Sequence, residues 1–195
     1  MKQLHVLAMR PTQFALGLQE VESKVKKLKN MSAKQRKRFM EDRLIQIVIG
    51  PKNIPYIVDH HHMVRACWET GIKKVPIEIK ADLSKVQQTS FWHMMSLAHW
   101  VHPFDQFGTK QDPDLLPLDI RGMADDPYRS LAWAVREAGG YDKVFVPFAE
   151  FRWANYFRKV ISIDDLRNNF DRAIKKALKA CKTRGGAVDL PGYKA

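Results

Sequence analysis

Cysteine is scarce in this sequence, because its 195 residues include only Cys67 and Cys181. The two lie far apart and form no C-x-x-C pair, so the sequence predicts neither a thiolate zinc site nor a disulfide framework. No apolar run approaches the roughly 20 residues that span a bilayer. The N-terminal stretch MKQLHVLAMRPTQ lacks the apolar core and cleavage site of a secretory signal. We therefore expect a cytoplasmic protein with reduced thiols and no membrane partner.

Acidic residues are outnumbered by basic ones, 21 to 33, which gives a formal net charge of +12. The excess is concentrated in two runs, residues 24–38 and residues 172–184. A basic surface favours an anionic partner, so the charge predicts that the chain binds a nucleic acid, a nucleotide or an acidic protein surface. It indicates a class of partner and not a reaction.

Hydrophobic periodicity predicts a mixed chain of short strands and helices. We expect strands at 4–9, 45–50, 55–59 and 73–83. We expect helices at 18–30, 33–43, 60–70, 90–101, 127–138, 150–160 and 164–181. The 90–101 segment is apolar almost all round, which is typical of a buried helix. After Leu83 the predicted strands give way to helices and turns. We therefore expect a core domain at 1–83 and a helical extension at 84–195 that packs on it.

The stretch YIVDHHHMVRA, residues 56–66, holds three of the seven histidines where a strand meets a helix. The amides and the dipole of a helix N-terminus favour anions, and imidazoles there donate hydrogen bonds or transfer protons. Successive side chains on a helix diverge by about 100°, so the three rings cannot all face one ligand. A metal site is a weaker alternative, because the helical zinc motif needs i, i+4 spacing. The third alternative is an ordinary capped helix whose histidines bind no ligand.

Further titratable residues fall in the predicted helices. Glu20 and Lys24 are i, i+4 neighbours, so they form either a surface ion pair or a site with a catalytic carboxylate. Asp126 precedes Pro127, which is typical of a helix N-cap. Another set either lines a cleft or forms buried ion pairs between helices: Asp125, Arg129, Lys143, Glu150 and Arg152.

Several stretches together carry a resemblance to a known superfamily: MRPTQFALGLQEVESK, VIGPKNIPYIVDHHHMVRA, FWHMM, MADDPYRSLAWAVREAGGYDK and PFAEFRWANYFR. The chain resembles the ParB/sulfiredoxin superfamily, in its ParB-like nuclease branch, over about residues 10–160. The resemblance implies an α+β fold in which helices flank a small mixed sheet, followed by a mostly helical C-terminal extension. It also implies a nucleotide ligand such as ATP, ADP or CTP, with Mg²⁺ as a companion ion.

Carried over by position, the resemblance implies a phosphate site on the turn at Asp59, His60, His61 and His62. Thr12 and Gln13 match the segment that closes on the nucleotide, with Lys24 and Arg65 as further candidates. Glu20 or Glu22 matches the catalytic carboxylate of kinase-like relatives, and His61 and His62 are the other catalytic candidates.

The turn also departs from its relatives, since His60 replaces a common glycine and Met63 a common arginine. It has no cysteine, which excludes sulfiredoxin chemistry. The sequence therefore predicts a nuclease or a nucleotide-dependent phosphotransferase. The alternative is a non-catalytic, nucleotide-gated DNA-binding adaptor that uses the basic runs, although no clear helix-turn-helix follows the core.

Overall fold

The computed structural model describes residues 1–183 and 186–194, so Arg184 of the second basic run lies outside the described residues. The chain divides into two compact units. Unit 1 comprises Met1–Leu16 and Val21–Ala124, and unit 2 comprises Gly17–Glu20 and Asp125–Ala195. The 84–124 segment belongs to unit 1, where its apolar side chains pack onto the sheet.

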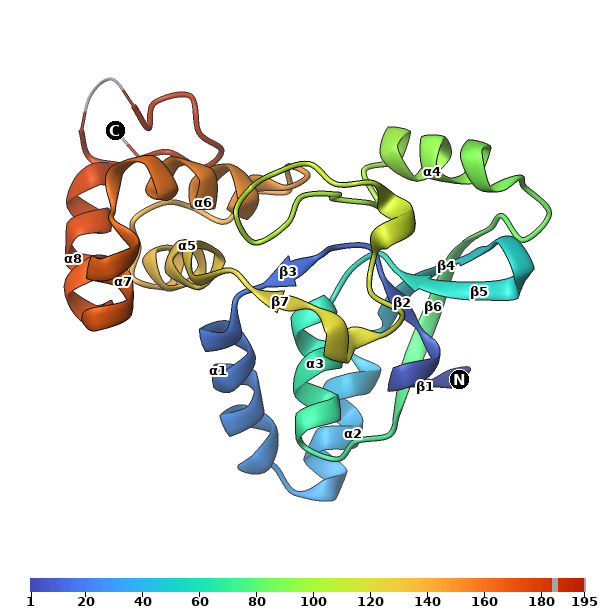
Figure 1. The fold of residues 1–195 in the computed structure, drawn as a ribbon. Coiled ribbons are helices and arrows are strands. Elements are labelled where there is room, and N and C mark those ends of the chain that lie inside the picture. Colours follow the sequence, from blue (N-terminus) through green and yellow to red (C-terminus); the bar gives the residue numbers. More distant parts are fainter. Residues whose placement is uncertain (184–185, 195) are drawn as a thin grey trace. The chain divides into compact units, whose positions relative to one another are not determined.

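A five-stranded mixed sheet forms the centre of unit 1, with strand order β1-β6-β4-β5-β2 (Figure 1). Its strands are β1 (Gln3–His5), β2 (Arg10–Pro11), β4 (Ile45–Gly50), β5 (Ile54–Ile57) and β6 (Lys74–Asp82). The pairs β1–β6 and β4–β5 are antiparallel, whereas β4–β6 and β2–β5 are parallel. Two short strands, β3 (Ala15–Leu16) and β7 (Ala124–Asp125), pair separately. The expected α+β class with a small mixed sheet is confirmed.

The β4–β5 hairpin has one face that packs on α4 (Gln88–Leu97). Val48 and Tyr56 are register partners and belong to a buried cluster with Phe91 of α4. The Tyr56 and Phe91 ring centroids lie 4.9 Å apart. Because side chains alternate along a strand, the neighbouring pair, Ile47 and Ile57, points to the other face.

The remaining helices of unit 1 are α1 (Leu18–Lys29), α2 (Ala33–Glu41) and α3 (His61–Glu69). The Sγ of Cys67 on α3 lies 3.9 Å from the Sδ of Met40 on α2, which places these two helices side by side (Figure 1). Burial raises the pKa of the Cys67 thiol to about 12. Both cysteines are free, as the sequence predicts.

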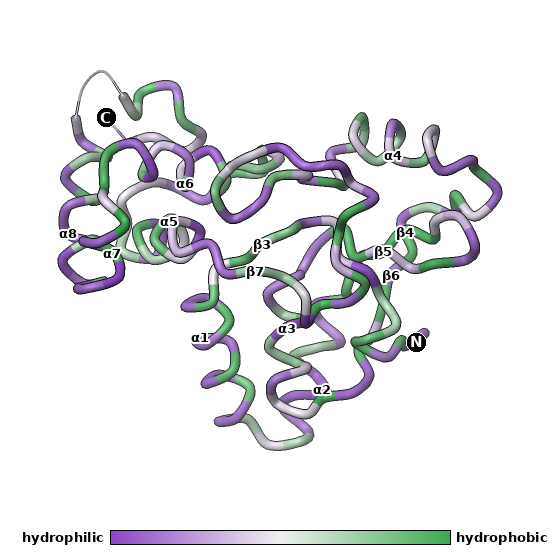
Figure 2. The backbone as a smooth tube through the Cα atoms, in the orientation of Figure 1, coloured by the Kyte–Doolittle hydropathy of each residue, from purple (hydrophilic) through white to green (hydrophobic). Residues whose placement is uncertain are grey.

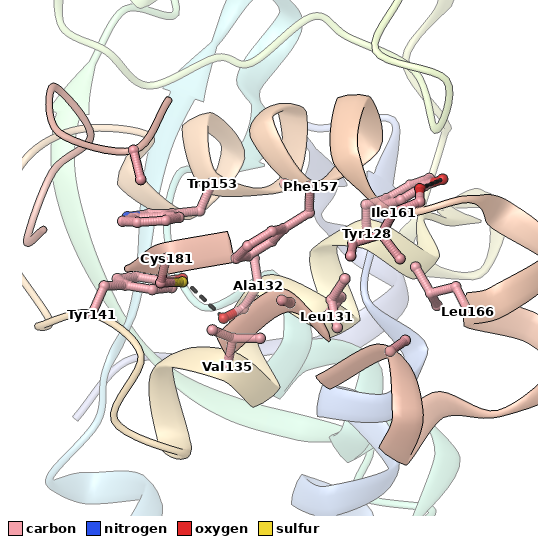
Figure 3. Close-up of a cluster of buried hydrophobic side chains, with 14 residues drawn as sticks. Tyr128, Leu131, Ala132, Val135, Tyr141, Trp153, Phe157, Ile161, Leu166 and Cys181 are labelled. Atoms are coloured by element: carbon pink, nitrogen blue, oxygen red, sulfur yellow. Dashed lines mark hydrogen bonds between the residues drawn. The ribbon is translucent and has the colours of Figure 1, made fainter. Parts of the chain in front are cut away.

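Unit 2 contains α5 (Pro127–Glu137), α6 (Ala149–Val160), α7 (Ile163–Asn168) and α8 (Phe170–Cys181). Their apolar faces form one core (Figure 3). In this core the Tyr141 and Trp153 rings stack with centroids 4.3 Å apart. The Tyr141 hydroxyl donates to the Ala132 carbonyl of α5, which the dashed line in Figure 3 marks.

Two predicted elements end or break early in the structure. The expected 4–9 strand ends at His5, whose Nδ1 accepts from the Leu7 amide and starts a 3₁₀ turn. The expected 164–181 helix is broken at Asn169, where an extended backbone separates α7 from α8. The Asn169 side chain accepts from the Arg172 amide and caps the second helix.

The helix α4 was expected to be buried, and this expectation is wrong. Only Phe91 and Met95 are buried, whereas Met94 and Leu97 are 40% and 69% exposed. One stripe of an otherwise apolar helix is enough to hold it against the hairpin. Across the described part of the chain, the helices are all too short or too polar to cross a bilayer.

Candidate functional site

The candidate site lies where β2 and β5 end. These strands run parallel, with Arg10 opposite Tyr56 and Pro11 opposite Ile57, so their carboxyl ends lie at the same edge of the sheet. Open sheets of this kind commonly bind ligands beyond the carboxyl ends of parallel strands. The residues that follow are Thr12 and Gln13 after β2, and the Asp59–His62 turn after β5.

His61 joins the two segments from inside the protein. The Thr12 amide donates to its Nε2 over 3.1 Å, and the Thr12 hydroxyl donates to the Ile57 carbonyl over 2.7 Å. Because Nε2 accepts this bond, the ring is neutral and carries its proton on Nδ1. The His61 side chain is buried, with 3% of the residue exposed. Its arrangement is that of a positioning residue that holds Thr12 against the turn.

His60 occupies the turn in a left-handed backbone conformation, with φ of 67°. Its amide donates to Asp59 Oδ1 over 2.6 Å, and its Nε2 lies 3.9 Å from Asp59 Oδ2. Glycine adopts this conformation without strain, which gives a physical reason for the glycine that the resemblance implies at this position. In this chain a histidine takes the left-handed conformation. His60 and His62 are both partly exposed.

Gln13 adds a buried acceptor next to this turn. Its Oε1 has no hydrogen-bond partner, and its backbone pairs with His102 in an isolated parallel bridge. An unsatisfied buried polar atom costs about 1–3 kcal/mol. A donor from a ligand or from water would remove that cost, which is consistent with the predicted role of the segment.

Arg65 and Lys24, two further predicted phosphate ligands, lie on different helices. The Arg65 Nε donates to Glu69 over 2.7 Å, and its Nη1 donates to the Ile120 carbonyl over 3.3 Å. These bonds hold the guanidinium between the Glu69 carboxylate and the Ile120 carbonyl. Met63 itself is buried, and Lys24 is half-exposed on α1.

The two candidate carboxylates on α1 differ in burial. Glu22 is exposed, whereas only 8% of Glu20 is exposed. Glu20 belongs to unit 2 and interacts electrostatically with Arg129. Burial lowers the pKa of Arg129, and the Glu20 carboxylate opposes that shift. Glu20 is therefore buried next to a positive charge, whereas the carboxylate of an ordinary surface ion pair is exposed to solvent.

A charged cluster surrounds Arg129 within unit 2. Its Nη2 lies 3.6 Å from Glu150 Oε2, and its guanidinium carbon lies 3.5 Å from the Phe151 ring centroid. Arg136 forms a second ion pair with Glu150. Arg129 Nε and Nη1 are buried and have no hydrogen-bond partner. The structure thus brings together Arg129 and Glu150 of the predicted cleft set.

The other three predicted cleft residues have separate surroundings. Asp125 Oδ1 accepts from the Leu18 amide over 3.0 Å, at the start of α1. The Arg152 guanidinium donates to the Asp189 carbonyl over 3.3 Å, and Lys143 is exposed. Asp125 acts as a helix cap here, and Arg152 fastens the C-terminal segment.

The sequence did not reveal the pair formed by Asp126 and Arg158. Asp126 caps α5 as predicted, with Oδ1 accepting from the Tyr128 amide, while Oδ2 accepts from Arg158 over 2.7 Å. Burial raises the pKa of the Asp126 carboxyl, and the Arg158 charge opposes the rise. The two residues are 32 positions apart, and no local pattern links them.

Metal ligands do not cluster in the part of the chain that the structure describes, where no group of three or more His, Cys, Asp and Glu side chains could hold an ion. Mg²⁺ is commonly held by one or two carboxylates together with substrate phosphates.

We expect His61→Ala to destabilise unit 1 by about 2–4 kcal/mol, because it leaves a cavity and an unpaired buried Thr12 amide. His61→Gln places a side-chain acceptor at a similar reach, so we expect it to recover at least about 1 kcal/mol of that loss. Urea unfolding curves of both variants would measure the difference. Equal stability of the two variants would show that the Thr12 hydrogen bond contributes little.

Comparison with known proteins shows which family and which fold the chain resembles. The family described as "Putative ParB-like nuclease" matches residues 2–159. The crystal structure of protein Atu1540 from Agrobacterium tumefaciens is similar, with 37% sequence identity and a TM-score of 0.92. That match covers 99% of this chain and 95% of the other. No curated protein matches. Since the family match spans most of its length, the chain belongs to the ParB-like nuclease family.

Proposed function

We propose that the chain binds the phosphate groups of a nucleotide at the Asp59–His62 turn and acts in a phosphate-centred reaction. The observation that carries the proposal is the hydrogen bond between Thr12 and His61, which holds two segments 49 residues apart at one edge of the sheet. It gives the turn a fixed shape before any ligand arrives. A preorganised site binds more tightly because less ordering is required on binding.

The partly exposed imidazoles of His60 and His62 are the proposed phosphate contacts, together with the positive end of the α3 dipole. Gln13 Oε1 is the proposed acceptor for a ligand N–H or O–H group. Asp59 holds the His60 amide and thereby keeps the turn in shape. His61 positions Thr12 and does not contact the ligand in this proposal.

Hydrolysis of a phosphodiester and transfer of a phosphoryl group both place developing negative charge on phosphate oxygens. His62 is the proposed proton-transfer group of the turn, since a partly exposed imidazole can exchange protons near neutral pH. The carboxylates of Glu20 and Glu22 stay predicted catalytic groups. Mg²⁺, when bound with the nucleotide, would offset phosphate charge.

The binding step is tested by thermal shift and calorimetry with ATP, ADP and CTP, each with and without Mg²⁺. A ligand at 100 times its Kd stabilises the protein by about 2.7 kcal/mol. We expect His60→Ala/His62→Ala to weaken binding by about a hundredfold or more, because each of the two lost charge-assisted hydrogen bonds contributes about 1.5–3 kcal/mol. His93→Ala is the matched control, an exposed histidine on α4. Equal affinity of the double variant and the control would refute the proposed site.

The reaction is tested separately, with supercoiled plasmid and with radiolabelled ATP. Plasmid nicking that the double histidine variant loses and the His93→Ala control keeps would identify a nuclease. Transfer of label to an acceptor, with the same dependence, would identify a phosphotransferase. Nucleotide binding without either product would leave the binding proposal intact and remove the catalytic one.

A further inference from the structure

Half of the net charge of the chain lies on one pair of helices. Residues 21–43, which contain most of α1 and all of α2, include nine Lys and Arg residues and three Asp and Glu residues, a net charge of +6 against +12 for the whole chain. Even if every carboxylate in this segment were paired, six cations would have no partner within it. An external anion is then the natural counter-charge.

The cations on these helices face outward. Lys26, Lys27 and Lys29 are exposed on α1, and Lys34, Lys37 and Arg38 are exposed on α2. The α2 positions are spaced i, i+3 and i+4, so they share one helical face. We call these six residues the basic surface. Figure 2 shows hydrophilic residues alternating with hydrophobic ones along α1, the pattern of a helix with one solvent-facing side.

Local interactions stabilise α1 and α2, the two helices that carry the basic surface. Ser32 and Gln35 form a capping box at the start of α2. The Phe39 ring of α2 lies under Lys27 Nζ at 4.9 Å and under the Arg43 guanidinium carbon at 4.1 Å. These contacts bring a cation of α1 and the arginine that follows α2 to one aromatic ring of α2. Repulsion among them is tolerated in the free protein and would be relieved by a polyanion.

The second basic run is a weaker candidate. Residues 163–182, which span α7 and α8, have six cations and three carboxylates, a net charge of +3. Lys176 Nζ is already paired with Asp165 Oδ2 at 2.6 Å. Residues 21–43 therefore carry twice the net charge of residues 163–182, a segment of similar length.

We propose that the basic surface binds the phosphate backbone of a nucleic acid without reading its bases. Lysine-rich surfaces bind phosphates electrostatically, and such contacts position a protein without giving sequence preference. A membrane surface is disfavoured as the partner, since interfacial helices insert an apolar face, whereas Leu28 and Met40 are buried within unit 1. The inference does not depend on phosphate binding at the α3 turn.

The test is fluorescence anisotropy with short duplex DNA of two unrelated sequences, between about 50 mM and about 200 mM salt. We expect similar affinities for both sequences and a steep salt dependence. The variant Lys26→Ala/Lys34→Ala/Arg38→Ala should bind at least about tenfold more weakly at the low-salt end, with a log–log slope reduced by about 2–3. All three residues are exposed, so the fold should persist, and circular dichroism would check it.

The matched control is Lys175→Ala/Lys179→Ala/Lys182→Ala, three exposed lysines at the other basic run. We expect it to keep most of the affinity. Equal loss in both triple variants would refute the assignment to the α1–α2 helices, and so would tight binding to anionic vesicles with none to DNA. Nucleotide binding measured on the same variants separates the two proposals, because the α1–α2 variant should keep it.

Discussion

Trp153→Ala should lower the free energy of unfolding of unit 2 by about 3–5 kcal/mol, the usual cost of truncating a buried aromatic side chain. Trp153 is fully buried and stacks on Tyr141 at 4.3 Å between centroids. Its Nε1 donates to the Pro191 carbonyl over 2.7 Å, so the substitution also leaves that acceptor without its donor. Guanidinium unfolding followed by far-ultraviolet circular dichroism would measure the loss.

Phe145→Ala is the matched control for this substitution, because the same unit carries an aromatic ring that is 99% exposed. We expect its effect to stay within about 0.5 kcal/mol, as is usual for surface substitutions. A loss below about 1 kcal/mol for Trp153→Ala would contradict the packing in Figure 3, since no repacking of small neighbours fills an indole-sized cavity.

The sequence predicted the elements whose signals are local. Ser32 and Gln35 make the capping box at α2, Asp126 and Pro127 open α5, and Gly71 follows α3 with φ of +75°. Local periodicity failed where the tertiary surroundings decide. The α4 helix reads as buried from its composition, although the sheet offers it only one face.

The candidate site was predictable in part, for a similar reason. The order of strand, acid and histidines marks the turn, and the resemblance places Thr12 near it. Which imidazole points inward is set by the parallel pairing of β2 with β5, a long-range contact that no local pattern encodes. His61 therefore read as a ligand group from the sequence, while the structure gives it Thr12 as its partner.

Arg129→Met should destabilise unit 2 by about 3–5 kcal/mol, because it leaves the buried Glu20 carboxylate without the positive charge of Arg129, whereas Glu150 keeps Arg136 as its partner. Arg129 is 5% exposed, and its charge interacts with Glu20 and Glu150. Methionine keeps much of the volume and can still contact Phe151. The loss of unfolding free energy therefore reports mainly on the missing positive charge. Urea unfolding would measure it.

The same substitution in a second background shows whether Glu20 depends on Arg129. If the Glu20 carboxylate is one of the charges that Arg129 compensates, Arg129→Met should cost about 1–3 kcal/mol less in a Glu20→Gln protein. Glu22→Gln is the matched control, an exposed carboxylate on the same helix, and should leave the cost unchanged. Additive effects for Glu20 and Arg129 would show that the two charges are uncoupled.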